Sequence, residues 1–328
     1  MMKKITSIFI FGLTFWFFGH FSVAHAQSVN LSISPPVVEI LIAPNKKVSQ
    51  TFNLQFEGDS LTVIPEIHAV KPMDTSGHVT VDPNPIKPAD IPLTITSINH
   101  VLGVPFTVQG NTVPITLSFE AASSDTSQDV YLALVLKAVP AEITDTSSVT
   151  TPAISALILA TITPDGILPI NLEVGDFSLP IIHDSWDPIT ITPTLVNHNP
   201  IMIRPLGTYE VISPGGKTIL SIPLYPNLIL GNASRVIEGS HGSTSTNTSP
   251  LPLPLSWSPT WYNIGPYRVH LTITSQGGTK LTDIEKVVWV LPIRIILGTI
   301  FFILITILLL YKKTISPKQQ IDSDNKDQ

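Results

Sequence analysis

An uninterrupted apolar run near the C-terminal end constrains this chain more than any other feature of its sequence. The stretch reads RIILGTIFFILITILLLYKK over residues 294–313, and every residue from 295 to 310 is apolar, Gly or Thr. As a helix, the 19 positions from 293 to 311 extend roughly 28 Å, which matches a hydrocarbon core of about 30 Å. The sequence therefore predicts a single transmembrane helix over residues 293–311.

The residues that flank this run match the two interfaces of a bilayer. Trp289 and Tyr311 lie where aromatic belts form, and Lys312 and Lys313 follow directly. Arg294 lies near the outer boundary, where its long side chain reaches the headgroups. These five residues are the predicted membrane-interface anchors. The lysine pair also predicts, by the positive-inside rule, that the short polar tail stays in the cytoplasm.

The N-terminal end has the features of a secretory signal peptide. Two lysines precede the apolar stretch ITSIFIFGLTFWFF, and Ala24 and Ala26 supply the small residues of a cleavage site. We therefore expect residues 1–26 to be removed, with a retained first transmembrane helix as the alternative. A single-pass protein of the cell membrane results, with its N-terminal domains extracellular and residues 312–328 as a cytoplasmic tail.

The exported part, about 260 residues long, is expected to form two domains that each bury a hydrophobic core. The chain contains no cysteine, so it has no disulfide, no thiolate metal site and no cysteine nucleophile. Charged residues make up 13% of the chain, against about 25% in average soluble domains. The net charge of −6 provides no basic field for nucleic acid. We expect no nucleic-acid partner, and the lack of cysteine favours a bacterial or archaeal envelope.

Short strand patterns fill the exported part. YRVHLTITS, residues 267–275, alternates apolar and polar side chains, as a strand with one buried face does. Residues 130–139 and 154–163 are nearly all apolar, as expected for central strands covered on both faces. Pro114 and Pro193 interrupt such patterns and predict strand starts, edges or bulges. Because no amphipathic helix is found between the two ends, we predict an all-β fold of two tandem antiparallel, immunoglobulin-like β-sandwiches.

Composition also locates the connections between these strands. TPDGILP, residues 163–169, predicts the domain boundary, which gives a first β-sandwich over 27–166 and a second over 167–290. Residues 140–152 have a linker composition but separate two strongly apolar strands, so we expect a long loop within the first sandwich. Residues 239–256 are expected to form the longest irregular stretch of the second domain, more consistent with disorder than with a functional loop.

Three segments carry a family resemblance. They are ISPPVVEILIAPNKKVSQTFNLQF (33–56), VPITLSFEAASSDTSQDVYLALVLKA (113–138) and WYNIGPYRVHLTITSQGG (261–278). Together with the signal peptide, the two cysteine-free sandwiches and the C-terminal helix, they resemble the WxL-interacting proteins, a family of bacterial cell-surface proteins. Pro44-Asn45 replaces the Pro-Gly turn of that family. The resemblance implies a non-enzymatic envelope protein whose domains engage a wall-associated partner and an external ligand.

Three polar clusters resemble functional motifs. IIHDSWDP offers His183, Asp184 and Asp187, but no G-x-S-x-G motif supplies a nucleophile for this His–Asp arrangement. Residues 73–84 contain oxygen ligands suited to Ca²⁺ without the spacing of an EF-hand, so a hairpin turn is favoured over a calcium site. SPGGKT, residues 213–218, lacks the first Gly of a phosphate loop and predicts a hairpin turn. We expect no catalytic residue, no cofactor and no metal ligand.

Aromatic residues before the last long strands are the better functional candidates. Trp257, Trp261 and Tyr262 lie in WSPTWYNIGPY, and such side chains dominate binding surfaces. We therefore mark them as candidate ligand contacts. The alternative is that they fill the membrane-proximal end of the second sandwich.

The sequence predicts a membrane-anchored cell-surface binding or scaffold protein that engages another envelope protein or a cell-wall polymer, and not an enzyme. Edge strands or the 239–256 segment are the expected contact surfaces, because strand addition needs only backbone groups. Two alternatives remain open. One is an envelope hydrolase that uses His183 or Asp184, and the other is an assembly chaperone that acts by strand exchange.

Overall fold

The structure is a computed structural model. It describes residues 30–58, 60–87, 90–109, 112–139, 152–166, 170–240, 251–275 and 278–315. The predicted signal peptide, with Ala24 and Ala26, lies outside the described residues, and so does the tail from residue 316 onward.

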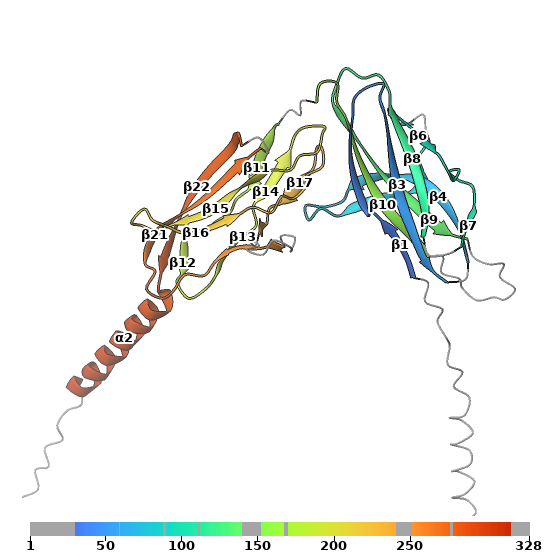
Figure 1. Cartoon of the computed structure of the whole chain (residues 1–328). Helices are drawn as coiled ribbons and strands as arrows, with labels where there is room; N and C mark the ends of the chain where they lie inside the picture. Colours follow the sequence, from blue (N-terminus) through green and yellow to red (C-terminus); the bar gives the residue numbers. More distant parts are fainter. Residues whose placement is uncertain are drawn as a thin grey trace, which may run out of the picture.

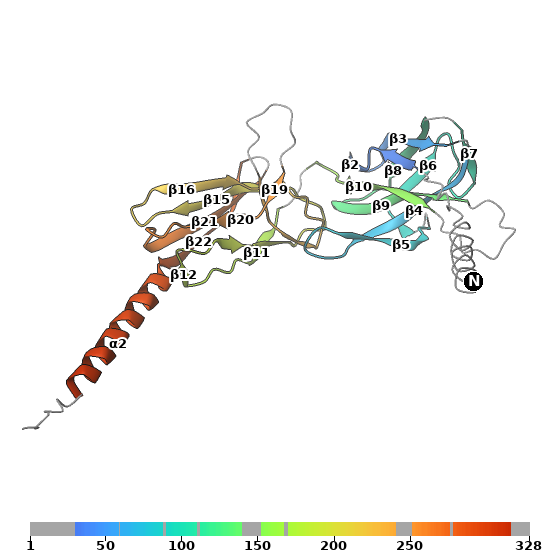
Figure 2. The ribbon, with the colours of Figure 1, turned by 90° about the horizontal axis from the view of Figure 1, so that it is seen from below.

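The first domain is a β-sandwich, and Figure 2 shows its two layers. One sheet has the strand order β1-β3-β8-β6, and the other has the order β2-β10-β9-β4-β5, with β7 also paired to β4. All neighbouring strands are antiparallel except β2 and β10, which are parallel. The strands are β1 (Asn30–Ser34), β2 (Val37–Ile42), β3 (Lys47–Glu57), β4 (Leu61–Pro72), β5 (Val79–Pro85), β6 (Leu93–Ser97), β7 (Phe106–Val108), β8 (Thr112–Ala121), β9 (Gln128–Ala138) and β10 (Ala153–Ile162).

The core of this sandwich follows from the alternation of its strands. Phe52 and Leu54 of β3 point inward and are fully buried, as are Leu132 and Leu134 of the opposite sheet. The nearly continuous apolar runs of β9 and β10 form the central strands of their sheet, as predicted. They carry a second, smaller buried cluster on the outer face, which includes Val135. Residues 140–151, for which a loop within this sandwich was predicted, lie outside the described residues, and the strands on either side of them, β9 and β10, pair with each other.

The second domain is built from shorter strands around its own core. Its main sheet has the order β12-β22-β21-β15-β16, and a three-stranded sheet β11-β14-β17 and the pairs β13-β20 and β18-β19 complete the fold. The strands are β11 (Leu172–Asp176), β12 (Ile182–Asp184), β13 (Ile189–Ile191), β14 (Thr194–Asn197), β15 (Leu206–Ile212), β16 (Thr218–Pro223), β17 (Ser234–Val236), β18 (Gly239–Ser240), β19 (Pro252–Leu253), β20 (Leu255–Trp257), β21 (Gly265–Thr274) and β22 (Lys280–Leu291).

The described residues before α2 therefore form two all-β sandwich domains, which confirms the predicted fold class. The prediction of one irregular segment over 239–256 is wrong at its two ends. Gly239 pairs with Leu253, and β20 forms a ladder with β13. The alternating prolines of this segment masked the strands, because short edge strands tolerate residues that lack an N–H. Residues 241–250 lie outside the described residues.

The two prolines singled out in the sequence lie where strand pairing begins or ends. Pro114 in β8 pairs with β3, but β6 accompanies β8 only from Leu117 onward, so Pro114 lies where the sheet has an open side. Pro193 lies immediately before β14. Both positions match the predicted strand start or edge, where a missing N–H costs no ladder hydrogen bond.

A single α-helix is found in the described ranges, α2 (Ile293–Ile315), and it projects away from the second domain (Figure 1). Only Pro292 separates it from the end of β22. The segment Ile293–Lys312 is long and apolar enough to cross a membrane, and none of it is buried in the protein. The helix predicted from the apolar run is therefore confirmed as a helix.

Candidate interdomain binding site

The two domains meet at the edge of the six-stranded sheet, where β2 is the outermost strand. Because β2 runs parallel to β10, its residues alternate between bonding to β10 and facing away from it. The N–H of Leu157 in β10 bonds to the carbonyl of Pro36. In this register the even-numbered residues of β2 form the ladder. The backbone groups of Val37, Glu39 and Leu41 therefore face the open edge.

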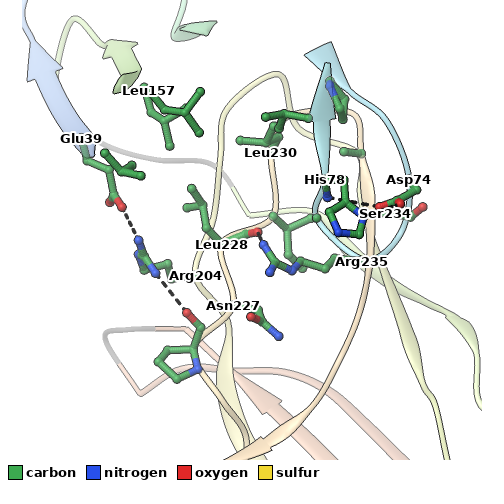
Figure 3. A pocket seen from close by; sticks show the side chains of 18 of the residues that line it. Glu39, Asp74, His78, Leu157, Arg204, Asn227, Leu228, Leu230, Ser234 and Arg235 are labelled. Atoms are coloured by element: carbon green, nitrogen blue, oxygen red, sulfur yellow. Dashed lines mark hydrogen bonds and ion pairs between the residues drawn. The ribbon is translucent and has the colours of Figure 1, made fainter. Parts of the chain in front are cut away.

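An apolar cavity of about 340 Å³ lies between the outer face of this sheet and loops of the second domain. The first domain contributes Val37, Leu157 and Leu159, and the second contributes Leu228 and Leu230. Figure 3 shows Leu157 facing Leu228 and Leu230 across the cavity. These aliphatic side chains share the walls with charged and polar ones, which include Glu39, Arg204 and Arg235, so the cavity can accept apolar groups beside polar ones.

An ion pair between Glu39 of β2 and Arg204 of the second domain borders this cavity (Figure 3). Arg204 also donates from Nη1 to the carbonyl oxygen of Pro226 at 3.0 Å, which orients the guanidinium. Because both side chains remain partly exposed, the pair contributes about 0.2–1 kcal/mol. A second cavity, of about 470 Å³, also contacts the ion pair and is lined by Leu41 and Met202. The ion pair thus stands between two recesses along β2.

A polar network that starts at Asp129 in β9 joins the domains more firmly. Its carboxylate accepts hydrogen bonds from Tyr131 Oη at 2.5 Å, Thr161 Oγ1 at 2.6 Å and the Met202 N–H at 2.5 Å. The hydroxyl of Tyr131 in turn accepts from the N–H of Gly231 at 2.7 Å. Burial raises the pKa of the Asp129 carboxyl, and the three donors partly offset that shift. Burial also raises the pKa of Tyr131, so its phenol remains a donor at neutral pH.

The turn between β4 and β5 makes a third contact between the domains. The carbonyl oxygen of Thr75 accepts a hydrogen bond from the N–H of Val236 in β17 at 2.8 Å. Gly77 lies against Arg235, where a Cβ atom would come within 2.4 Å of the guanidinium carbon. Arg235 itself donates to the carbonyl oxygen of Leu228 at 2.8 Å (Figure 3). The φ of +88° at Gly77 favours glycine at this turn, and the absent Cβ leaves room for the Arg235 guanidinium.

The side chains considered as calcium ligands act within this same hairpin. Asp74 accepts hydrogen bonds from the N–H groups of Ser76 at 2.8 Å and His78 at 3.1 Å. Its other oxygen lies 2.6 Å from His78 Nδ1, and this hydrogen bond lowers the pKa of Asp74. Asp82 accepts from the N–H of Asn84 at 3.0 Å. In the part of the chain that the structure describes, no three His, Asp or Glu side chains form a group that could hold a metal ion.

The residues of the hydrolase alternative lie at the other end of the second domain, next to α2. Asp187 accepts hydrogen bonds from Arg294 Nη2 at 2.7 and 2.9 Å, and Asp184 lies 3.3 Å from Arg294 Nε. His183 Nε2 is bonded to the backbone carbonyl of Asp187 at 3.1 Å. His198, the next histidine along the chain, lies apart from this group and pairs with Glu173. Asp184 and Asp187 thus attach the first turn of α2 to the second domain through Arg294. The SPGGKT segment forms the β15–β16 hairpin turn, as predicted.

The three candidate aromatic residues divide into two kinds. Trp257 is buried in the core of the second domain, with its ring 4.7 Å from that of Tyr267. It therefore offers no surface to a ligand. Trp261 and Tyr262 are 58% and 65% exposed and pack edge to face. None of the three lines the interdomain cavities.

The predicted membrane-interface anchors lie at the two ends of α2. Trp289, near the end of β22, is about half exposed, and Tyr311 is exposed near the far end of the helix. Lys312 is also exposed, whereas the side chain of Lys313 lies outside the described residues. Arg294 is held by the two carboxylates described above.

Sequence reasoning did not identify Glu39, Arg204, Asp129 or Tyr131 as site residues. Their partners lie far away in the chain, and Glu39 and Arg204 are separated by 165 positions. One signal was available, because Glu39 in VVEILI and Asp129 in QDVYLALVLKA are lone acidic residues in apolar strands. A charge is rarely kept in such a strand unless it has a partner.

No protein-family model matches the chain, and no curated protein sequence matches it. Among solved structures, it is similar to a chain of the chaperone–tip adhesin complex of CFA/I fimbriae, with a TM-score of 0.40, 10% identity, and coverage of 79% of this chain and 98% of that one. The class 5 fimbriae chaperone CfaA gives a TM-score of 0.37, 10% identity, and coverage of 79% and 99%. A chain of the Salmonella enterica SafA pilin–SafB chaperone complex gives 0.34, 12% identity, and coverage of 80% and 98%. At these scores the likeness carries no inference about function.

Proposed function

We propose that this protein is a membrane-anchored cell-surface binding or scaffold protein, without catalytic activity, that engages another envelope protein or a wall polymer. The observation that supports the proposal is the free edge of β2, which runs between two apolar-lined recesses at the junction of the domains. On this proposal the two domains lie outside the cell, and α2 crosses the membrane once. The resemblance to WxL-interacting proteins is consistent with such a role.

The favoured ligand is an extended segment of a partner polypeptide laid along β2. The outward backbone groups of Val37, Glu39 and Leu41 offer ladder hydrogen bonds, which recognise a strand without regard to its sequence. Side chains on one face of an added strand recur about every 6.6 Å. Successive apolar side chains of the partner can therefore enter the recesses on the two sides of the Glu39–Arg204 pair.

The membrane helix adds to this binding by mass action. A site held at the membrane sees an effective partner concentration that a soluble domain does not reach. Strand addition of only a few residues is weak by itself, so anchoring makes it sufficient for a scaffold.

The test is a pair of substitutions at one position. Glu39→Pro removes the outward N–H of β2 without removing a ladder bond to β10, because position 39 faces the open edge. Glu39→Ala is the matched control, since it removes the same ion pair but keeps the N–H. Both variants of the full chain, and the unmodified chain, are solubilised from the native envelope in mild detergent with a photo-crosslinking residue at Leu41. A crosslinker at Ile98, exposed in the first domain, reports background.

We expect a defined protein adduct at position 41 that is absent at position 98, survives Glu39→Ala and falls at least tenfold in Glu39→Pro. Purified wall polymer is the second probe, and it should compete for the Leu41 site if the ligand is a glycan. The proposal fails if neither a surface protein nor wall polymer is captured at position 41 above the background at position 98.

An assembly chaperone that acts by strand exchange is the second candidate, because the same open edge of β2 suits a partner that is held briefly. Pulse-chase labelling separates the two. A scaffold retains its adduct in the mature envelope, whereas a chaperone loses it as newly exported partners mature.

A further inference from the structure

The membrane-proximal end of the second domain can be identified from strand direction alone. β22 runs toward α2, and β12 lies parallel to it, so Asp184 pairs with Leu291. β21 is antiparallel to β22, and its first residue, Gly265, pairs with Val290. The turn that follows β12 and the loop that precedes β21 therefore reach the level at which the helix begins, and Figure 1 shows α2 leaving next to β12.

These two connections carry exposed aromatic and aliphatic side chains. Trp186, in the turn after β12, is 51% exposed, and Ile264, in the loop before β21, is 55% exposed. Trp261 and Tyr262 lie in the same loop and are exposed. Trp289 of β22 is also exposed and pairs with Pro266, the second residue of β21. We call these five residues the basal patch. Exposed Trp and Tyr in this number are unusual on a water-facing surface and typical of membrane interfaces.

The height of the basal patch above the bilayer follows from the chain length between β22 and α2. Two residues extend at most about 7 Å, so Leu291 lies within that distance of Ile293, where the apolar helix begins. Each headgroup layer is roughly 5–8 Å thick, because the full bilayer measures 40–45 Å around a core of about 30 Å. The end of the sheet and its two loops therefore fall at the level of the headgroups.

The charges at this end of the domain are compatible with lipid. Asp184 and Asp187, the acidic residues beside the patch, are both paired with Arg294. Lys217, in the β15–β16 turn, is exposed at the same end, since Ile212 at the end of β15 pairs with Arg268 near the start of β21. The surface therefore presents a cation and neutralised carboxylates toward the membrane.

We propose that the basal patch is a second, non-spanning membrane contact, with Trp186, Trp261 and Tyr262 seated in the headgroup layer. The occupant of this surface is the lipid bilayer that α2 enters. Such a contact restrains the tilt of the second domain on its single-residue connection to the helix. The inference rests on the membrane anchoring contained in the proposed function and is independent of the ligand of β2.

The experiment uses the full chain in vesicles of phosphatidylcholine and phosphatidylglycerol at a 3:1 ratio. Because the chain has no cysteine, a spin label can be placed at one site at a time by Ile264→Cys, Leu304→Cys or Val101→Cys. Leu304 lies in the middle of α2, and Val101 is exposed in the first domain, so they report lipid and water respectively. Collisional relaxation by oxygen and by a water-soluble nickel chelate gives the depth of each label.

We expect the label at position 264 to be shielded from nickel at least threefold relative to position 101, with a depth between those of positions 101 and 304. Trp186→Ser combined with Trp261→Ser and Tyr262→Ser should return position 264 to the accessibility of position 101. Ile98→Ser, at an exposed site of the first domain, should change nothing.

Two results overturn the inference, and they are distinguishable. Equal nickel accessibility at positions 264 and 101, with position 304 in lipid, shows that the helix is anchored and the patch is not. Nickel access at position 304 shows that the anchoring itself is absent, which removes both this inference and the membrane part of the proposed function.

Discussion

Removing the hydroxyl of Tyr131 at the domain interface should weaken the docking of the two domains. Removing the hydroxyl of Tyr209 in the core of the second domain should not. Tyr131→Phe deletes an oxygen that donates to Asp129 and accepts from the Gly231 N–H. Tyr209→Phe is the same chemical change in the second domain. The hydroxyl of Tyr209 is buried and, among the described residues, has no hydrogen-bond partner.

The size of the expected effect follows from the bonds that are lost. Tyr131→Phe leaves the Asp129 carboxylate short of one donor and the Gly231 N–H without its acceptor. Each partly buried group left in this way costs about 1 kcal/mol or somewhat more, so the total is about 2 kcal/mol. At 1.4 kcal/mol per tenfold change, the ratio of docked to undocked domains falls roughly 30-fold. For Tyr209→Phe no bond is lost, and the stability should stay equal or rise.

Double electron–electron resonance on the full chain in nanodiscs measures this directly. Spin labels at Ile98→Cys and Ile219→Cys, one exposed site in each domain, report the distance between the domains. We expect one narrow distance distribution for the unmodified chain and for Tyr209→Phe, and a broad one for Tyr131→Phe. If Tyr131→Phe gives the same narrow distribution as Tyr209→Phe, the network that starts at Asp129 does not hold the domains together.

Two further substitutions test other parts of the fold. The pKa of Asp129 in the folded protein is raised above its unfolded value of about 3.9. Its protonated form therefore stabilises the fold below about pH 3.9, and this stabilisation is lost as the pH rises through the folded-state pKa. Asp129→Asn should therefore flatten the pH dependence of thermal unfolding in the acid range, and an unchanged slope would contradict the assignment. Gly207→Ala places a Cβ atom 2.0 Å from the carbonyl oxygen of Thr272 and should destabilise the second domain by about 3 kcal/mol. Calorimetry should show only the second domain's transition shifting, and Gly215→Ala, where the new Cβ meets nothing within 4 Å, should leave it unchanged.

Local pattern was enough to predict the fold class, because burial in a sandwich is decided strand by strand. The alternation around Tyr267 and Leu271 places those side chains in the second core, and the apolar run around Leu134 marks a strand covered on both faces. The same reasoning missed β18 to β20, which are only two or three residues long. A period of two cannot be recognised in so few residues.

The interdomain site could not be predicted in the same way, because its geometry is set by the docking of two separate domains. Within the first domain alone, Glu39 is an ordinary residue of an edge strand, because its ion-pair partner, Arg204, belongs to the second domain. Asp129 receives its interdomain donor from the backbone of Met202, whose side-chain identity is irrelevant to the bond. Contacts made by backbone groups leave no residue signature, so no motif search finds them. A lone acidic residue in an apolar strand is the sequence signal by which such a contact can still be suspected.

On the proposed function, the joints between the parts of this protein determine how the edge of β2 is presented to a partner. A single residue, Pro292, connects β22 to α2, and Arg294 Nη2, which donates to both carboxylate oxygens of Asp187, restrains that connection. The network that starts at Asp129 restrains the junction of the two domains in turn. Both joints carry side-chain contacts, unlike a flexible linker, for which the reach would grow with the square root of its length. On the proposed function, the edge of β2 is therefore held at a narrow range of heights above the membrane, and loosening either joint should weaken capture of a partner of fixed height even when β2 itself is unchanged.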